Sequence, residues 1–224
     1  MEILFKNKNA VVVYKPPALS SQPDKIASTD AMTETASALR AGGEDSSLWL
    51  VHRLDKVVGG LLVFARNKNS AAKLCELVKV RGIAKEYLAV IDGVCEGSGI
   101  MKDYLFKDSA KNKAFIVDRM RSGVKEAELE YSALETVETD KGAKTLVKVT
   151  LVTGRFHQIR AQFASRKTAL TGDGKYGSKD NLARFPSLFA YHLSFELAGD
   201  CVDVYKYPDS ETYPWSLFSK EHFK

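Results

Sequence analysis

The chain has 224 residues, of which 45% are hydrophobic and 27% charged, and its formal net charge is +5. This composition is typical of a globular protein and excludes a wholly disordered, collagen-like or membrane-embedded chain. The length suits one large domain or two small ones. We expect a single compact domain over 1–224, because no stretch of the sequence is composed like a linker.

The number and spacing of the cysteines and histidines indicate the cellular compartment and whether a metal is bound. The three cysteines are odd in number and widely spaced, and the sequence has no CxxC pair. This usage is typical of a reduced, intracellular protein without a disulfide framework, so we expect a cytoplasmic location. The four histidines lack the spacing of zinc ligands, and we therefore expect no bound metal.

Hydrophobic patterns predict a chain built mainly of strands. We expect strands at 10–14, 48–51, 60–65, 87–91, 127–133, 147–151, 188–195 and 201–205. The first is a β-branched run that two prolines end, because proline cannot continue a strand ladder. The segments 127–133 and 147–151 alternate apolar and polar residues, as half-buried antiparallel strands do.

Three helices are predicted between these strands. They are expected within 20–47, from 70 to 82 and over 156–166. Thr29 or Asp30 can cap the first helix and Gly42 can end it, whereas Ser70 begins the second. Hairpin strands with few helices predict an α+β fold with a mixed, mainly antiparallel central sheet flanked by helices.

One short stretch carries most of the excess positive charge. Between Met101 and Lys125 there are seven basic and three acidic residues, and Tyr104, Phe106 and Phe115 stand among them. Such a basic arm can lie along phosphates and stack on bases. On charge alone, a solvated hairpin is the simpler interpretation. The candidate contacts are Lys111, Lys113, Arg119 and Arg121.

Polar residues crowd the turn between the strands at 48–51 and 60–65. His52, Arg53, Asp55 and Lys56 all lie there. A carboxylate that lies between apolar strands and close to cations can be tuned as a nucleophile or a base. The alternative is an ordinary turn with an Arg–Asp pair.

A second group of donors lies where a strand turns into the third helix. Arg155, Gln158 and Arg160 are close together near the expected helix N-terminus, which suits an anionic partner. Alternatively, the Arg155 guanidinium has a structural role on a backbone carbonyl or a surface acid.

The segment Gly172–Gly177 matches the GxGxxG pattern of dinucleotide-binding proteins. No strong apolar strand precedes it and no periodic helix follows it, so the glycines are better explained by a tight loop. The sequence has no GxxxxGK loop either. We therefore expect no nucleotide cofactor.

Four strings together resemble the RluA family of pseudouridine synthases. They are VHRLDK at 51–56, GLLVFAR at 60–66, KEYLA at 85–89 and TGRFHQIR at 153–160, in the order and spacing of that family. The segment 172–177 resembles its GDxxYG loop, and YKPP at 14–17 resembles its NKP element. The likeness runs from about Val12 to Phe195 and begins so early that we expect a stand-alone catalytic domain without the S4-type domain.

The chain departs from the family in two places. The family usually continues HRLDK with an acid, Thr, Ser and Gly, whereas here Val57, Val58 and Gly59 follow Lys56. Two hydroxyl groups beside the expected reacting carboxylate are therefore missing. In the family's LHA string, Phe189 stands where His is usual. These changes affect the surroundings of the expected site and leave its core residues intact.

The resemblance implies an enzyme that isomerises uridine in RNA without a cofactor. By motif match, Asp55 is the reacting carboxylate, Arg155 is its buried guanidinium partner and Tyr87 stacks on the uracil. Arg53 is expected to fill the gap that the flipped base leaves in the RNA. The expected RNA contacts are Arg53, His52, Lys111, Lys113, Arg119, Arg121, Gln158 and Arg160. His52 and His157 are expected to orient loops rather than to carry protons.

We therefore expect a monomeric pseudouridine synthase that acts on ribosomal or transfer RNA. One alternative is a catalytically silent RNA-binding protein on the same scaffold, which the Val57-Val58-Gly59 departure suggests. Another is an Asp-dependent hydrolase of a small phosphorylated substrate, although no second catalytic carboxylate stands out to support it.

Overall fold

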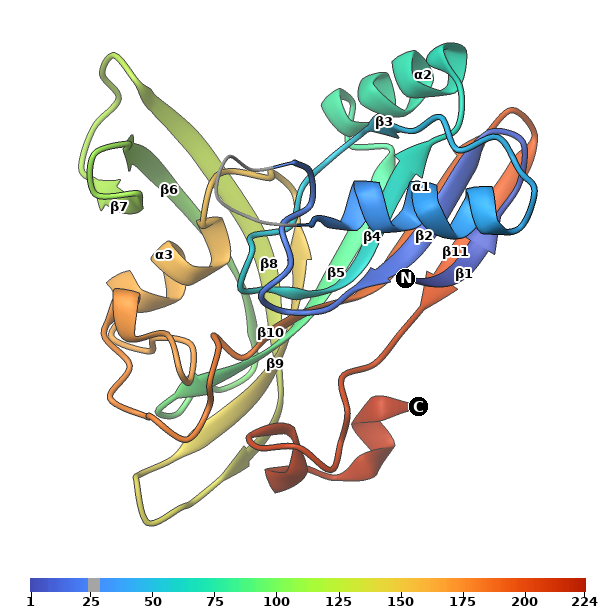
Figure 1. Ribbon diagram of the computed structural model, residues 1–224. Helices are drawn as coiled ribbons and strands as arrows, with labels where there is room; N and C mark the ends of the chain where they lie inside the picture. The colour runs from blue at the N-terminus through green and yellow to red at the C-terminus, as the bar shows by residue number, and fades with distance from the viewer. Residues whose placement is uncertain (24–28) are drawn as a thin grey trace. The chain divides into compact units, whose positions relative to one another are not determined.

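The computed structural model describes residues 1–23 and 29–224, and its contacts divide the chain into two compact units (Figure 1). The first unit comprises Met1–Lys85 and Ala190–Lys206, and the second comprises Glu86–Phe189 and Tyr207–Lys224. Part of the predicted polar loop, 24–28, lies outside the described residues. The expectation of one domain over 1–224 stays a prediction.

The first unit is built on a sheet whose strands are mostly buried. In sheet order its strands are β1 (Glu2–Lys6), β2 (Ala10–Lys15), β4 (Gly59–Ala65) and β10 (Leu188–Leu197), with β11 (Asp200–Tyr205) beside β10 and β3 (Trp49–Leu50) beside β4. The β1–β2, β2–β4, β3–β4 and β10–β11 pairs are all antiparallel. In the β2–β4 ladder, Ala10 pairs with Ala65 at one end and Lys15 with Gly60 at the other.

Two helices cover opposite faces of this sheet. Helix α1 (Ala31–Ala41) packs on the face that carries Val11 and Val13, and Figure 1 shows it lying across β2 and β4. Helix α2 (Lys68–Lys79) packs on the face that carries Val12. Because both faces are buried, β2 and β4 are continuous apolar runs in the sequence rather than alternating ones.

The caps explain where the two helices begin. The Asp30 side chain accepts a hydrogen bond from the Thr33 backbone N–H, as predicted for one of the two candidate caps of α1. Helix α2 begins two residues before the predicted Ser70, because the Asn67 side chain accepts from the Ser70 backbone N–H. Each cap satisfies a backbone donor that the first turn of a helix leaves without a partner.

The second unit is an antiparallel meander with one helix packed on it. Its strand order is β5 (Ile83–Asp92), β9 (Lys144–Leu151), β8 (Val124–Val137), β6 (Ser98–Asp108) and β7 (Lys113–Val117). Helix α3 (Gln158–Ser165) contributes Ala161 to a core shared with Leu105 of β6 and Ala127 of β8. Three short 3-10 helices cover Gly174–Tyr176, Trp215–Leu217 and Lys220–Phe223.

The predicted α+β class, with a mainly antiparallel sheet and flanking helices, is confirmed. The sequence analysis missed β1, and it treated β6 and β7 only as a basic arm, because charged residues mask their alternation. Within the described ranges, none of the helices is long and apolar enough to cross a membrane.

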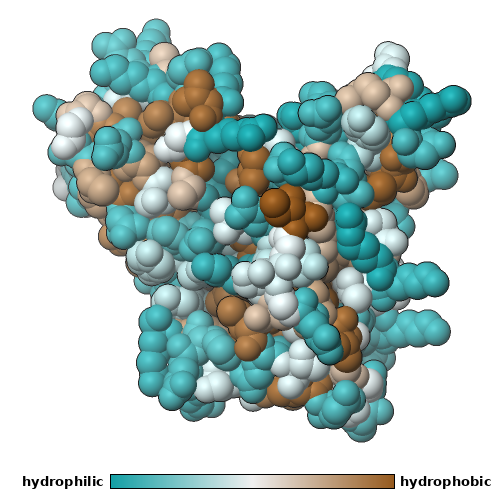
Figure 2. All heavy atoms as spheres, turned by 180° about the vertical axis from the view of Figure 1, so that it is seen from behind, coloured by the Kyte–Doolittle hydropathy of each residue, from teal (hydrophilic) through white to brown (hydrophobic). Residues whose placement is uncertain are grey.

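Hydrophilic side chains cover most of the face that Figure 2 shows, with apolar side chains exposed in small groups between them. The large apolar residues with the most exposed surface are Val80, Val94, Ile100, Met120, Leu134, Leu182 and Tyr205. They come from many different elements, and single exposed apolar residues of this kind are normal on a protein surface.

A buried charged network holds the C-terminal segment of the second unit. Lys144 Nζ lies 2.5 Å from Asp92 and 3.0 Å from Asp180, and the Tyr213 hydroxyl donates to Asp180 at 2.5 Å. Burial opposes the charge of Lys144, but the two carboxylates outweigh it and raise its pKa. Burial likewise opposes the charge of Asp180, yet hydrogen bonds from Tyr213 and Lys144 lower its pKa to about 2. The network therefore keeps Lys144 and Asp180 charged.

We expect Gly60→Ala to lower the free energy of unfolding by at least ~2 kcal/mol, measured by urea denaturation. Gly60 has a φ of +127°, and a Cβ there would lie 2.3 Å from the Ala190 carbonyl oxygen. Gly199→Ala is the matched control, because Gly199 has a φ of +89° but nothing within 4 Å of the added carbon. Equal losses in the two variants would contradict the close approach at Gly60.

Candidate active site

The turn that carries Asp55 is anchored by a pair of hydrogen bonds to Ser21. The Ser21 hydroxyl donates to the Leu54 carbonyl at 2.9 Å and accepts from the Leu54 backbone N–H at 3.0 Å. The Asp55 carbonyl accepts from the Val58 backbone N–H at 3.0 Å. Leu54 is buried, Asp55 is half-buried, and Arg53 is exposed. These hydrogen bonds fix the backbone of the turn on both sides of Asp55.

A buried lysine contributes positive charge beside this turn. The Lys15 side chain is fully buried, and its Nζ donates to the carbonyls of Pro16, Leu19 and Lys56 at 2.9, 2.8 and 3.3 Å. Burial lowers the pKa of Lys15 to about 7, and the negative charge of Asp55 acts against this lowering. A protonated Lys15 in turn favours the ionised form of Asp55.

The sequence analysis assigned no role to Lys15. The only signal was its place in the string YKPP, which resembles the NKP element. Composition and periodicity could not have found it, because a lysine at the end of an apolar run is usually solvated.

His52 positions the start of the turn. Its Nε2 accepts a hydrogen bond from the Val63 backbone N–H at 3.3 Å. Burial, and then the positive charge of Lys85, lower the pKa of His52 to about 3. A neutral imidazole that accepts from β4 agrees with the expectation that His52 orients the turn. Its role as an RNA contact stays a prediction.

The second unit carries the other predicted catalytic residues. Tyr87 lies on β5, opposite Val149 of β9, and is 6% exposed. Gln158 at the start of α3 is also buried: its Nε2 donates to the Glu128 carbonyl, and its Oε1 accepts from the Arg155 backbone N–H. The Gln158 amide thus closes the strand–helix junction, and its role as an RNA contact stays a prediction.

The two arginines of the string 153–160 have different surroundings. Arg155 is exposed and its Nε donates to the Glu126 carbonyl at 2.9 Å. This corrects the expectation of a buried Arg155 and agrees with the alternative that its guanidinium contacts a backbone carbonyl. Arg160 is 4% exposed, and its Nε and Nη2 donate to Asp173 at 2.6 and 2.8 Å. The structure thus places Arg160 in a buried ion pair, and its role as an RNA contact stays a prediction.

The loop 172–177 supports this buried arginine. Arg160 Cζ lies 5.0 Å from the centre of the Tyr176 ring, and the Tyr176 hydroxyl accepts from the Ala114 backbone N–H and contacts His157 Nδ1. Burial, and then the charges of Arg160, Lys175 and Lys107, lower the pKa of His157 to about 3. The tight-loop interpretation of these glycines is confirmed, because only a three-residue 3-10 turn, 174–176, follows Asp173.

The basic arm of β6, β7 and the loop after them combines cations with aromatic rings. Lys111, Arg119 and Arg121 are exposed. Lys111 Nζ lies 5.8 Å from the centre of the Phe115 ring, and Arg121 Cζ lies 5.8 Å from that of Phe106. This arrangement offers both charge and stacking surface to a single-stranded nucleic acid.

Lys113 differs from its neighbours in the basic arm. It is half-buried, and its Nζ donates to the Lys175 carbonyl at 2.6 Å and lies 4.8 Å from the Tyr176 ring centre. Lys113 therefore ties β7 to the loop 172–177, and it has less freedom than Lys111 to reach a phosphate.

Among the described residues, no group of three or more His, Cys, Asp or Glu side chains is arranged to hold a metal ion. The expectation of a reaction without a cofactor stays a prediction.

Comparison with known proteins relates this geometry to a family. The family described as RNA pseudouridylate synthase matches residues 9–165. An uncharacterized RNA pseudouridine synthase of Aquifex aeolicus (strain VF5) is 32% identical over 212 residues, which is 87% of this chain and 65% of that protein. The ribosomal large subunit pseudouridine synthase C of Haemophilus influenzae is 32% identical over 182 residues, covering 80% of this chain and 53% of that protein.

The fold also matches a solved structure. Human RNA pseudouridylate synthase domain containing 1 superposes with a TM-score of 0.77 over 93% of this chain and 83% of that chain, at 21% identity. The chain spans less than two thirds of the length of the two curated relatives. The matches confirm the resemblance that the motifs carry, and the chain belongs to the RNA pseudouridylate synthase family.

Proposed function

We propose that the chain isomerises uridine to pseudouridine in RNA, with Asp55 as the reacting carboxylate. The observation that carries this proposal is the Asp55 turn, which is anchored to Ser21 and lies beside the buried Lys15, in a chain that belongs to the family. Asp55 is half-buried, so the charge that its surroundings stabilise is not fully screened by water.

The reaction rearranges one nucleotide without adding an atom. The bond between ribose C1′ and uracil N1 breaks, the base turns, and C5 forms a bond to C1′. The C5 proton leaves and N1 gains a proton, so the atoms balance without a cofactor. Asp55 either attacks C1′ or removes the C2′ proton, and both routes need its ionised form. Tyr87 would stack on the uracil and assist the loss of the C5 proton.

We propose Arg160, rather than the predicted Arg155, as the guanidinium that keeps Asp55 ionised. An exposed ion pair contributes only about 0–1 kcal/mol, whereas a desolvated guanidinium can lower a carboxyl pKa strongly. Arg160 is the buried arginine of the string, and Asp173 holds two of its donors at fixed positions.

The proposed substrate is ribosomal or transfer RNA. The Haemophilus relative is named for the ribosomal large subunit, and the basic arm offers exposed cations to phosphates. Arg53 is exposed next to Asp55 and would stack in the place of the flipped uridine. Action as a monomer in the cytoplasm belongs to the same proposal and is derived from the sequence.

A second candidate function is RNA binding without catalysis. The departure at Val57, Val58 and Gly59 favours it, because the Thr and Ser hydroxyl groups that the resemblance leads us to expect at positions 58 and 59 are absent beside Asp55. Val58 is 2% exposed, so this position packs against the core rather than facing a substrate.

Asp55→Asn tests the proposal directly. We expect pseudouridine formation to fall by at least ~10²-fold, because the amide can neither attack C1′ nor accept the C2′ proton. RNA binding and the melting temperature should change little. The measurement is tritium release from RNA labelled at uridine C5, with the exposed Asp140→Asn as control. An inactive wild-type chain that still binds RNA would establish the silent alternative, and an active Asp55→Asn variant would refute the role of Asp55.

Measurements of stability and of activity together distinguish the roles of Arg155 and Arg160. Arg160→Ala should lower the free energy of unfolding by ~3–5 kcal/mol, because it leaves the buried Asp173 charge without its partner. Arg155→Ala should cost less than ~1 kcal/mol, because that residue is exposed. Arg160→Lys keeps the charge but loses the bidentate fork, so it should remain folded with reduced activity. An inactive but stable Arg155→Ala beside a fully active Arg160→Lys would return the role to Arg155.

The basic arm is tested by the salt dependence of RNA binding. Replacing Lys111, Arg119 and Arg121 together by Ala should make the slope of log K against log salt shallower by about 2, at ~0.7 for each phosphate contact on a single strand. Replacing Lys141, Lys179 and Lys220 by Ala removes the same charge from exposed positions elsewhere and should leave the slope nearly unchanged. Equal effects of the two triple variants would show that only net charge matters.

A further inference from the structure

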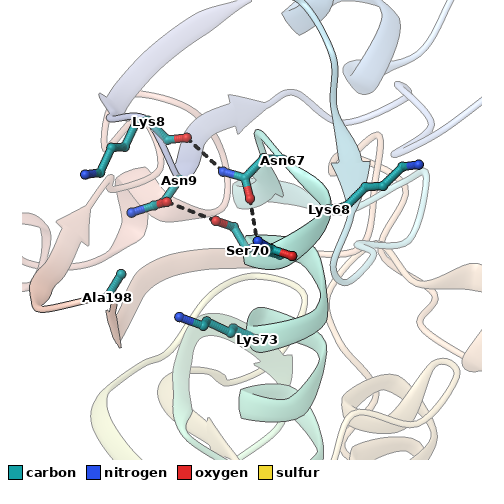
Figure 3. Close-up of a pocket in the computed structure, with 8 residues that line it drawn as sticks. Lys8, Asn9, Asn67, Lys68, Ser70, Lys73 and Ala198 are labelled. Carbon is teal, nitrogen blue, oxygen red and sulfur yellow. Dashed lines mark hydrogen bonds between the residues drawn. The ribbon is translucent and has the colours of Figure 1, made fainter.

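A surface pocket of about 500 Å³ lies at the N-terminal end of α2, within the first unit (Figure 3). It is lined by Lys8, Asn9, Asn67, Lys68, Asn69, Ser70, Lys73 and Ala198. Its place in the β2–β4 ladder separates it from the Asp55 turn. The pocket lies at the Ala10–Ala65 end and the turn at the Lys15–Gly60 end, and the ladder between them is about 17 Å long at ~3.4 Å per residue.

Hydrogen bonds between its lining residues form the wall of the pocket, as Figure 3 shows. The Asn67 side chain donates to the Lys8 carbonyl at 3.1 Å and accepts from the Ser70 backbone N–H at 2.8 Å. The Ser70 hydroxyl donates to Asn9 Oδ1 at 3.0 Å. These bonds hold β2 and the first turn of α2 against each other, so the pocket is preformed.

One buried donor in this wall has no acceptor. Asn9 is 9% exposed, and its Nδ2 has no hydrogen-bond partner among the described residues. In Figure 3 this nitrogen points away from Ser70, toward the side of the pocket where Ala198 and Lys73 lie. A buried amide donor without a partner costs ~1–3 kcal/mol. An acceptor group that enters the pocket would satisfy this donor.

The charges around the pocket specify the kind of acceptor. Lys8, Lys68 and Lys73 are all exposed at its edge, and no acidic residue is among those that line it. The nearby Asp200 carboxylate accepts a hydrogen bond from Asn7 Nδ2 at 2.9 Å. The first backbone N–H groups of α2 add the positive end of a helix dipole. In Figure 3 the Lys68 side chain extends away from Asn9, so the ammonium groups of Lys8 and Lys73, the helix N-terminus and the Asn9 amide donor are the groups that favour an anion here.

Phosphate is the anion that fits this set. It has several acceptor oxygens and no need to donate, so it can bind the Asn9 amide, lysine ammonium groups and helix N–H groups at once. The pocket is large enough for a phosphate group together with the sugars attached to it. A single metal cation or an apolar ligand would leave the lysines and Asn9 Nδ2 without partners.

We propose that this pocket binds a phosphate group. Two sources share this chemistry: the RNA backbone and free inorganic phosphate. Binding of an RNA backbone phosphate rests on the proposed function. In that case the pocket would anchor the RNA at a distance from the target uridine, which reaches the Asp55 turn.

The probes are inorganic phosphate and a short single-stranded RNA, and the readout is the side-chain amide signal of Asn9 in ¹H–¹⁵N NMR spectra of the full chain. We expect both probes to shift this signal. A spectrum in which neither probe moves it would overturn the proposal. A shift with millimolar phosphate but not with RNA would assign the site to free phosphate and reject the RNA source.

Two charge-matched double variants then distinguish an effect of the pocket on RNA binding from an effect of net charge. Lys8→Gln with Lys73→Gln should weaken RNA binding about fivefold or more, and should make the salt slope shallower by ~0.7 for one lost phosphate contact. Lys79→Gln with Lys220→Gln removes the same charge, with Lys79 on the same helix but in its last turn, and should leave affinity and slope nearly unchanged. Equal effects of the two double variants would overturn the RNA source.

Binding and turnover are measured separately, so that the two proposals can fail separately. Pseudouridine formation at subsaturating RNA should fall in step with RNA affinity in Lys8→Gln with Lys73→Gln, and it should be unchanged in Lys79→Gln with Lys220→Gln. A chain that binds RNA through the pocket but forms no pseudouridine would refute the proposed function and support the pocket. A chain that forms pseudouridine but whose Asn9 amide signal does not shift with either probe would support the proposed function and refute the pocket.

Discussion

The local structure around Asp55 depends on one buried ammonium group. Lys15 ends β2 inside the protein, where a charge is costly unless it is hydrogen-bonded. Its three carbonyl partners come from the segment after β2 and from Lys56 beside Asp55. Satisfying one charge therefore fixes the path of two chain segments and supplies positive potential to the carboxylate. The Ser21 bonds to Leu54 hold the same turn from the other side.

The second unit uses a buried ion pair in a similar way. Arg160 and Asp173 are both almost fully buried, so each charge is stable only while the other is present. Their bidentate contact joins α3 to the loop 172–177, and Tyr176 extends the contact to β7 through Ala114. Such pairs are weak evidence for stability, but they impose a definite geometry. Here the pair holds two of the guanidinium donors of Arg160 at fixed positions on Asp173.

The groups that surround the basic residues matter more for ligand binding than the net charge of the protein. The net charge is only +5. In the basic arm, cations lie over aromatic rings, which suits unpaired bases and phosphates. In the pocket at α2, lysines surround an amide donor that lacks an acceptor, which suits a phosphate group. The basic arm belongs to the second unit and the pocket to the first unit.

The strands and helices with strong apolar patterns, the α+β class and the family could be predicted from the amino-acid sequence, the family through the strings around Asp55 and Arg160. Which arginine is buried could not be predicted, because Arg155 and Arg160 differ only by their position in one string. The amide of Asn9 that lacks an acceptor could not be predicted either. Burial and hydrogen-bond partners depend on segments far apart in the chain, so they become known only once the chain is folded.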